Sequence, residues 1–174
     1  RIGLNAAGSV ALGNSGGGLY IASANNTIGG VTAEARNVIS GNALKPKDIL
    51  TSRKGLTVEV NDTDAEGRLI LADALALANE SPTDAIISMA TLTGAARTAL
   101  GPDLAPYYTD DAVMAAALES GATASFDPVW RMPFHTPYEA IIEPGIADLD
   151  NAPGWGFAGS VTAALFLRRF ADHP

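Results

Sequence analysis

The sequence predicts an α/β fold, with a partial mixed or parallel sheet and flanking helices, preceded by a glycine-rich β segment. Two observations predict this class. In residues 44–174, apolar runs of strand length alternate with stretches of strong helix formers, which is the order of elements in layered α/β domains. Residues 1–43 instead hold nine of the 18 glycines and six of the nine asparagines, and almost no charge. The chain therefore divides into two parts, 1–43 and 44–174.

The first part, residues 1–43, combines turn residues with β-branched residues. Because glycine and asparagine tolerate positive φ and β-branched residues fit strands, "NNTIGG" at 25–30 and "NVISGN" at 37–42 predict short strands with sharp corners. The stretch from Gly13 to Asn42 resembles the coils of right-handed parallel β-helix proteins of the pectate-lyase-like kind. Such solenoids stack three or more repeats, and two at most are present here. A glycine-rich loop region with a hairpin or two is an equal alternative.

Residues 56–92 predict a β-α-β unit. "LTVEV" at 56–60 alternates β-branched and polar residues, as a half-buried strand does. Residues 69–78, "LILADALALA", are strong helix formers and apolar almost all round, which indicates a helix covered on several sides. "AIISMATL" at 85–92 is a continuous apolar run, typical of a parallel strand covered on both faces.

Two further helices are expected in the second part. Residues 111–121 predict a helix with an aspartate at its start and Gly121 at its end. Residues 159–170 predict another, with Ser160 as the N-cap and two arginines in the last turn, where they complement the helix dipole. Five prolines break the stretch between these helices, so we expect loops there.

Composition excludes several classes of protein. A net charge of −8 argues against nucleic-acid binding, which needs clustered lysine and arginine. No apolar run reaches the roughly 18 residues of a membrane-spanning helix, so no membrane partner is expected. The absence of cysteine excludes disulfides and thiolate metal sites but leaves the compartment open. The chain begins with Arg1 and shows no secretory signal pattern, so the sequence alone assigns no location.

"NDTDAEGR" at 61–68 and "TLTG" at 91–94 follow successive predicted strands. Because ligands of α/β sheets bind at the carboxyl ends of the strands, we expect these two loops to face one cleft. Asp64 and Glu66 offer the oxygen ligands that divalent cations bind, and Gly67 allows a tight turn. Arg68 places a permanent positive charge beside them, suited to an oxyanion or small anion.

A structural explanation of the same residues stands beside this one. Acidic side chains in the first turn of a helix gain about 0.3–1 kcal/mol each from the helix dipole alone. Asp62 and Asp73 are expected to be a loop carboxylate and a solvated or ion-paired helix residue. His135 and His173 lack the paired spacing of zinc ligands, so both are interpreted as structural or surface groups.

The segment "NDTDAEGRLILADAL" resembles the signature of the leucyl aminopeptidase family of two-metal exopeptidases, N-T-D-A-E-G-R-L. Further stretches of residues 44–174 are similar to segments on either side of it: "KPKDILTSRKGLTVEV", "MATLTGA", "DPVWRMPFHTPYEAIIEPGIADLDNAP" and "GFAGSVTAALFLRRF". The resemblance implies that Asp64 and Glu66 bind metal, either manganese or zinc. It also implies that Arg68 is catalytic and binds a bicarbonate that shuttles protons, and that Thr91, Leu92 and Gly94 hold the peptide.

The sequence also departs from the family pattern. The first asparagine of the signature is Asp62 here. The family's remaining ligands, a lysine and two aspartates, and its second catalytic lysine lie in an upstream segment, K-G-x-x-F-D-T-G-G, which this sequence does not contain. Lys45 and Lys47 match the approach to the strand and do not replace them. The strands that end the family's domain are missing beyond Pro174.

The resemblance therefore predicts a metal-dependent aminopeptidase that releases N-terminal residues from peptides, with an incomplete site in this chain. It implies a peptide substrate, a homo-oligomer (a hexamer in the family) and a cytoplasmic location, with secretion left open. The alternative is a non-catalytic β-repeat or binding protein that carries an aminopeptidase remnant. We also predict that strands from residues 1–43 either extend the α/β sheet or pair one chain with another, since both parts have open strand edges.

Overall fold

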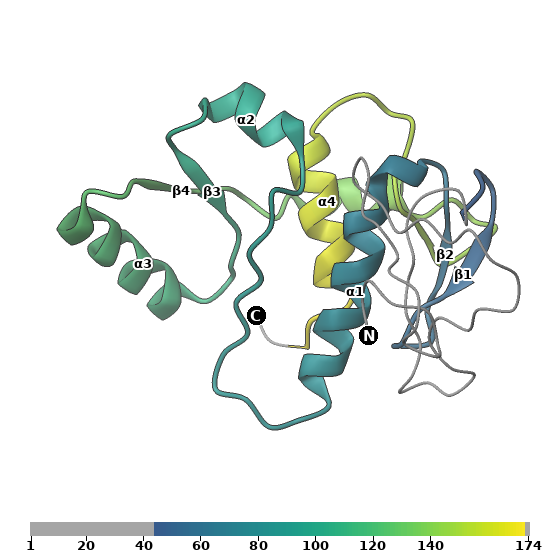
Figure 1. Cartoon of the computed structure of the whole chain (residues 1–174), viewed down its shortest axis with the longest axis horizontal. Coiled ribbons are helices and arrows are strands. Elements are labelled where there is room, and N and C mark those ends of the chain that lie inside the picture. Colours follow the sequence, from purple (N-terminus) through teal and green to yellow (C-terminus); the bar gives the residue numbers. More distant parts are fainter. Residues whose placement is uncertain (1–43, 173–174) are drawn as a thin grey trace, which may run out of the picture. The chain divides into compact units, whose positions relative to one another are not determined.

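The structure is a computed structural model that describes residues 44–172 (Figure 1). Three short strands form a mixed sheet in the order β1-β2-β5: β1 (Ile49–Thr51), β2 (Thr57–Glu59) and β5 (Leu149–Asp150). The first two pair antiparallel, whereas β2 and β5 run parallel, with Val58 opposite Leu149. The predicted α/β class and the strand at 56–60 are confirmed.

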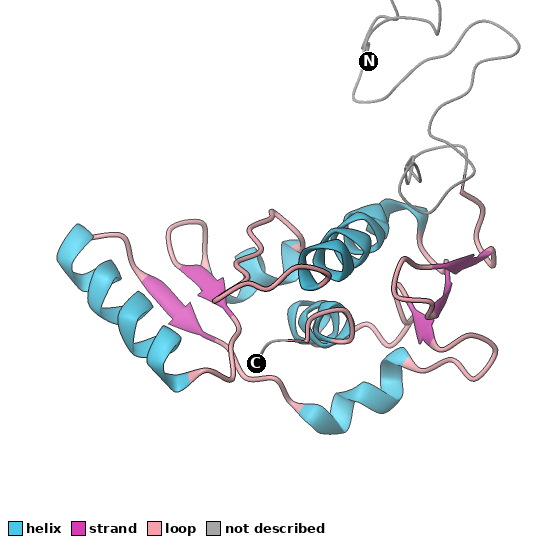
Figure 2. Ribbon diagram, turned by 90° about the horizontal axis from the view of Figure 1, so that it is seen from below, coloured by secondary structure: helices cyan, strands magenta, loops and turns pink. Residues whose placement is uncertain are grey.

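Two helices supply most of the core beside this sheet. Helix α1 (Glu66–Asn79) confirms the helix expected at 69–78, and α4 (Gly159–Arg168) confirms the one expected at 159–170. Figure 2 shows α4 between α1 and the 3-10 helix η3 (Thr136–Ile142). Phe166 and Phe170 are fully buried, with ring centroids 5.3 Å apart. Helix α1 itself buries one stripe, Leu69, Ala72, Leu75 and Ala76, and exposes Ile70 and Leu77, so the expectation of a helix covered on several sides was wrong.

A second pair of strands frames the third long helix. Strands β3 (Ala105–Tyr107) and β4 (Val129–Arg131) pair in parallel, with α3 (Ala112–Ser125) along them (Figure 2). Asp111 caps α3 by accepting the N–H groups of Val113 and Met114 at 2.7 and 3.0 Å. The helix does not end at Gly121 as predicted, because its hydrogen bonding continues to Phe126, whose left-handed backbone (φ 58°) ends it.

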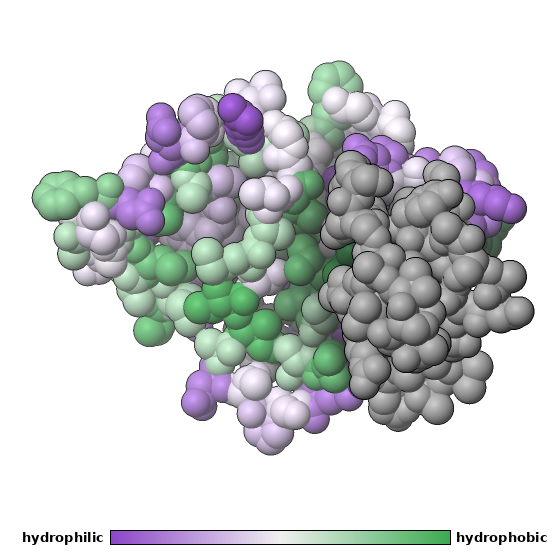
Figure 3. Space-filling view, in the orientation of Figure 1, coloured by the Kyte–Doolittle hydropathy of each residue, from purple (hydrophilic) through white to green (hydrophobic). Residues whose placement is uncertain are grey.

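The strand predicted at 85–92 is absent. These residues form no regular element, and Met89 and Ile87 expose 88% and 68% of their surface. Figure 3 shows apolar side chains at the surface where this segment runs in Figure 1. The prediction of a doubly covered strand was wrong because, within residues 44–172, no strand lies beside the segment to complete its backbone hydrogen bonds.

Three smaller expectations need correction. Ser160 does not cap α4: the N-cap is Ala158, and the Ser160 hydroxyl shares a 2.7 Å hydrogen bond with that of Tyr108. The proline-rich stretch is not all loop, because it contains β4, η3 and β5, and Pro137 suits the first turn of η3. Asp73 accepts the backbone N–H of Arg53 at 2.7 Å rather than standing in solvent.

Other expectations concern residues that the structure does not describe. The β-helix-like strands of 1–43, their pairing with the sheet and the surroundings of His173 all lie outside the described residues. Within residues 44–172, the helices are too short or too polar to cross a membrane.

Candidate active site

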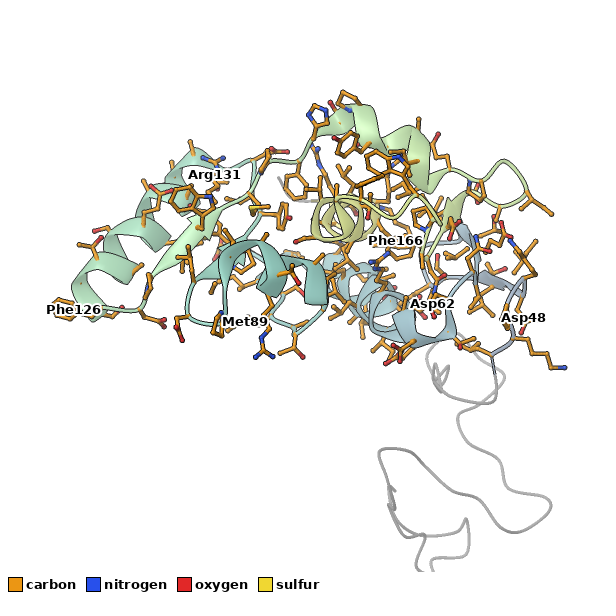
Figure 4. The ribbon with its side chains drawn as sticks, turned by 90° about the horizontal axis from the view of Figure 1, so that it is seen from above. Asp48, Asp62, Met89, Phe126, Arg131 and Phe166 are labelled. Atoms are coloured by element: carbon orange, nitrogen blue, oxygen red, sulfur yellow. The ribbon has the colours of Figure 1, made fainter. Side chains whose placement is uncertain are left out.

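The acidic signature lies where β2 passes into α1. After β2 the chain forms one 3-10 turn, η2 (Thr63–Ala65), and then enters α1 at Glu66. Asp62 has extended backbone and caps this turn, since its carboxylate accepts the Asp64 N–H at 2.9 Å. Asp62 is labelled in Figure 4. The loop carboxylate expected at Asp62 is therefore a helix cap.

The Asp64 and Glu66 carboxylates are unpaired. Within residues 44–172, neither makes a hydrogen bond or an ion pair with another side chain, although Asp64 is exposed and Glu66 half-buried. They stand two residues apart on helical backbone, a spacing at which side chains diverge rather than meet. In this part of the chain, no three acidic or histidine side chains gather into a metal site. The pair thus offers two free oxygen ligands but no closed cage.

Arg68, in the first turn of α1, is hydrogen-bonded to the residue that follows β5. Its Nη1 donates to the carbonyl oxygen of Asn151 at 2.5 Å. Burial lowers the pKa of the Arg68 guanidinium, whereas the charges of Asp150 and Asp62 raise it. Because an arginine guanidinium is not deprotonated in proteins, the group stays charged at neutral pH. A positive charge held by a hydrogen bond therefore lies in the first turn of α1.

The Asn151 side chain ties the signature segment to β5. It is fully buried, and its Oδ1 accepts the backbone N–H groups of Asn61 and Asp62 at 2.8 and 3.2 Å. Its Nδ2 donates to the carbonyls of Asp62 and Ala65 at 2.6 and 3.4 Å. Sequence reasoning missed this residue, which stands about 90 positions from its partners in a stretch expected to be loop. No local pattern carries such a contact.

Two buried carboxylates, those of Glu59 and Asp150, are linked to the start of the signature segment. Glu59 and Asp150 lie opposite each other on β2 and β5 and expose only 6% and 5% of their surface. Lys47 pairs with Glu59 at 2.8 Å and also donates to the side-chain oxygen of Asn61. Asn61 in turn donates to Asp150. The buried charges are thus paired or hydrogen-bonded, as burial requires.

The second predicted loop reaches the first through Leu92. The Cδ1 of Leu92 lies 3.4 Å from where a Cβ on Gly67 would stand, so the start of α1 and this segment are in contact. Thr91 is exposed, and Gly94 begins the short helix α2 (Gly94–Leu100), which Thr93 caps. The two segments approach each other at Leu92 and Gly67, and a cleft that both of them face stays a prediction.

His135 lies in a different setting. Its ring packs edge-on against Tyr138, with centroids 4.5 Å apart, and Tyr138 packs in the same way against Trp155 at 4.8 Å. The residue is exposed. This matches the interpretation of His135 as a structural or surface group.

Comparison with known proteins places this geometry in context. A family model described as "Cytosol aminopeptidase family, catalytic domain" matches residues 7–174. A probable cytosol aminopeptidase of Trichormus variabilis is 49% identical over 148 residues, which cover 83% of this chain and 29% of that protein. One from Nostoc punctiforme is 50% identical over 143 residues, 80% of this chain and 28% of that protein.

A solved structure gives the same result. A mutant of tomato leucine aminopeptidase superposes with a TM-score of 0.72 at 44% identity, over 79% of this chain and 27% of that one. The chain thus spans less than a third of the length of these relatives. Its sequence and its fold are similar to one portion of them.

Proposed function

Since this chain belongs to the cytosol aminopeptidase family, we propose that it supplies part of the active site of a metal-dependent aminopeptidase. The observation that carries the proposal is that, within residues 44–172, the carboxylates of Asp64 and Glu66 at the start of α1 have no hydrogen-bond or ion-pair partner. Carboxylates without a protein partner are available to a divalent cation. The reaction is release of the N-terminal residue of a peptide.

Asp64 and Glu66 are the residues that would hold the metal. Their oxygen donors suit manganese and also zinc. A bound ion supplies Lewis-acid polarisation of the peptide carbonyl. Two carboxylates alone bind an ion weakly, so a tightly bound ion needs further ligand atoms from outside the described residues.

Arg68 is proposed to hold a small anion, bicarbonate, in the reaction. Its Nη1 is used by the Asn151 carbonyl, and a guanidinium has five N–H donors, so others stay available. The buried setting strengthens any charge interaction that it makes. Arg68 therefore orients the bicarbonate, which passes the proton, while the Arg68 guanidinium keeps its own protons.

Thr91, Leu92 and Gly94 are proposed to bind the peptide. Leu92 lies against Gly67, so an apolar side chain lies at the start of α1. Gly94 has open space around its Cα, so a peptide backbone could approach closely there. By analogy with its relatives, which are named cytosol aminopeptidases, the chain is proposed to act in the cytoplasm. The homo-oligomer implied by the family resemblance is proposed as well.

Hydrolysis of leucine p-nitroanilide by the full chain, with added Mn²⁺ or Zn²⁺, tests the proposal. Because the chain carries only two of the family's ligands, we expect at most slow turnover, which chelation removes and Asp64→Ala abolishes. Asp103→Ala, which removes one exposed carboxylate outside the signature, should leave turnover unchanged. Absence of turnover with either metal would favour the non-catalytic alternative.

A further inference from the structure

We infer that Asn151 is a positioning residue for the metal ligands, a role that rests on the proposed function. It does not touch the metal or the peptide in this scheme. It fixes the backbone of residues 61–65, which carries Asp64 and leads into Glu66, and it fixes Arg68 through its own carbonyl.

The hydrogen-bonding capacity of this amide is fully used. A primary amide has two N–H donors and two acceptor lone pairs. In Asn151 both lone pairs accept backbone N–H groups, from Asn61 and Asp62, and both donors are directed at backbone carbonyls, of Asp62 and Ala65. The side chain is wholly buried. No other side chain of this size offers the same two donors and two acceptors.

The segment that it holds has little regular structure of its own. Strand β2 ends at Glu59 and α1 begins at Glu66, with only the single turn η2 between them. Four of its backbone polar groups find their partner in Asn151. Asp64 lies between Asp62 and Ala65, the two residues whose carbonyls these bonds hold. The backbone position from which the Asp64 carboxylate extends is therefore fixed.

The same residue also places the cationic group. The carbonyl oxygen of Asn151 accepts from Arg68, and its N–H donates to the Glu59 carbonyl at 3.0 Å, which continues the β2–β5 pairing. A single residue at the end of β5 thus sets the relative position of a ligand-bearing loop and the guanidinium. Loss of its side chain should loosen Asp64 while the strand pairing through its backbone persists.

The discriminating variant is Asn151→Asp. It keeps the shape and both acceptor positions but loses the two donors to Asp62 and Ala65. It also adds a negative charge near the site, which by itself would strengthen cation binding. Weaker metal binding in this variant therefore reports lost geometry, not lost charge.

Asn79 provides the matched control. It lies at the far end of the same helix, α1, where its Nδ2 donates to the Phe170 carbonyl at 2.6 Å. Asn79→Ala removes a part-buried amide-to-backbone bond without touching the signature. It should lower the thermal midpoint of unfolding and leave metal binding unchanged.

The test is line broadening of backbone amide signals by sub-stoichiometric Mn²⁺ in nitrogen-15 NMR spectra of the full chain, at a temperature where all variants are folded. In the native chain and in Asn79→Ala, we expect broadening concentrated at residues 62–66. In Asn151→Asp, the Mn²⁺ needed for equal broadening should rise at least about fivefold. Broadening within twofold of the native chain would overturn the inference.

Amide hydrogen exchange without metal separates this inference from the proposed function. The amides of Asn61 and Asp62 should exchange at least about tenfold faster in Asn151→Ala, while that of Val58 changes little. Unchanged exchange at 61 and 62 would overturn the anchoring role. If the native chain shows no Mn²⁺ broadening at 62–66 but the exchange result holds, the proposed metal site fails and the anchoring by Asn151 stands.

Discussion

The part of the chain that carries the signature and the part from 85 to 131 differ sharply in packing. Of the buried apolar side chains in residues 44–172, all but Ala115 lie in β2, at Val60 just after it, in β5, α1 or η3, or in the stretch from α4 to Phe170. Residues 85–131 thus bury almost no apolar side chain and expose several large ones: Ile87, Met89, Val113, Phe126 and Trp130. The other part also exposes large apolar groups, such as Leu77 and Phe157, so the two parts differ in how much they bury and not in whether they expose apolar surface.

This difference has a functional side. Asp64, Glu66 and Arg68 are anchored on the packed part, where Asn151 and the paired carboxylates of β2 and β5 fix them. Thr91 and Gly94, expected to hold the peptide, lie on the exposed part. The proposed metal-binding residues are therefore held by more contacts than the residues proposed to bind the peptide.

The largest effect should come from the packed part. Phe166→Ala removes a fully buried ring that packs on Phe170, and we expect a loss of about 3–5 kcal/mol of unfolding free energy. Figure 4 shows Phe166 inside the molecule and Phe126 at its outer end. Phe126→Ala, at a side chain that is 93% exposed, should change it by less than about 0.5 kcal/mol. Equal losses in urea unfolding would contradict the comparison.

A smaller gain is expected at the end of α3. Phe126 adopts left-handed backbone, which costs a non-glycine residue about 1 kcal/mol and which glycine adopts freely. Phe126→Gly should therefore be more stable than Phe126→Ala by several tenths of a kcal/mol up to about 1. Urea unfolding of the two variants measures this, and a less stable glycine variant would show that the backbone there is unstrained.

Removal of apolar groups from 85–92 should cost least among the packing changes. Met89→Ser and Ile87→Ser alter exposed side chains, so each should shift unfolding free energy by less than about 0.5 kcal/mol. A loss of about 2 kcal/mol in either variant would mean that the segment packs against something in solution. Sedimentation of both variants would then show whether that partner is another chain.

The acid dependence of stability should involve Asp148. Its carboxylate accepts from the Thr57 backbone and hydroxyl at 2.8 and 2.7 Å, and these hydrogen bonds hold the pKa of Asp148 below its ordinary value of 3.8. A lowered pKa gives stability that is present above pH 3.8 and is lost as the pH falls through the folded-state pKa. Asp148→Asn should flatten the urea midpoint between pH 5 and pH 2, and an unchanged slope would contradict this.

Local patterns account for the longer elements. Strong helix formers marked α1, α3 and α4, because each of these helices spans enough residues for its periodicity to show. All five strands in residues 44–172 have only two or three residues, too few for a period of their own, and β2 was found because it lies within the longer alternating run at 56–60. The run at 85–92 looked like a buried strand because hydrophobicity records what a segment can bury, whereas burial depends on a neighbour.

The charged residues of the candidate site could be named from the sequence, but the residues that hold them could not. Asp64, Glu66 and Arg68 fall within one contiguous motif, and its position before a helix suggested their role. Asn151, Asp150 and Lys47 act through contacts between distant segments. Such residues have no sequence spacing that marks them, so only the folded chain shows them.

Calorimetric titration of Mn²⁺ into the full chain tests the central claim, that Asp64 and Glu66 bind a divalent cation. Asp64→Asn/Glu66→Gln removes both ligands, and Asp84→Asn/Asp103→Asn removes two exposed carboxylates elsewhere, for the same change in net charge. We predict weak Mn²⁺ binding, with a dissociation constant of about 1 mM, in the native chain and in the control, and no binding in the signature variant. Equal binding by the two double variants would contradict the claim.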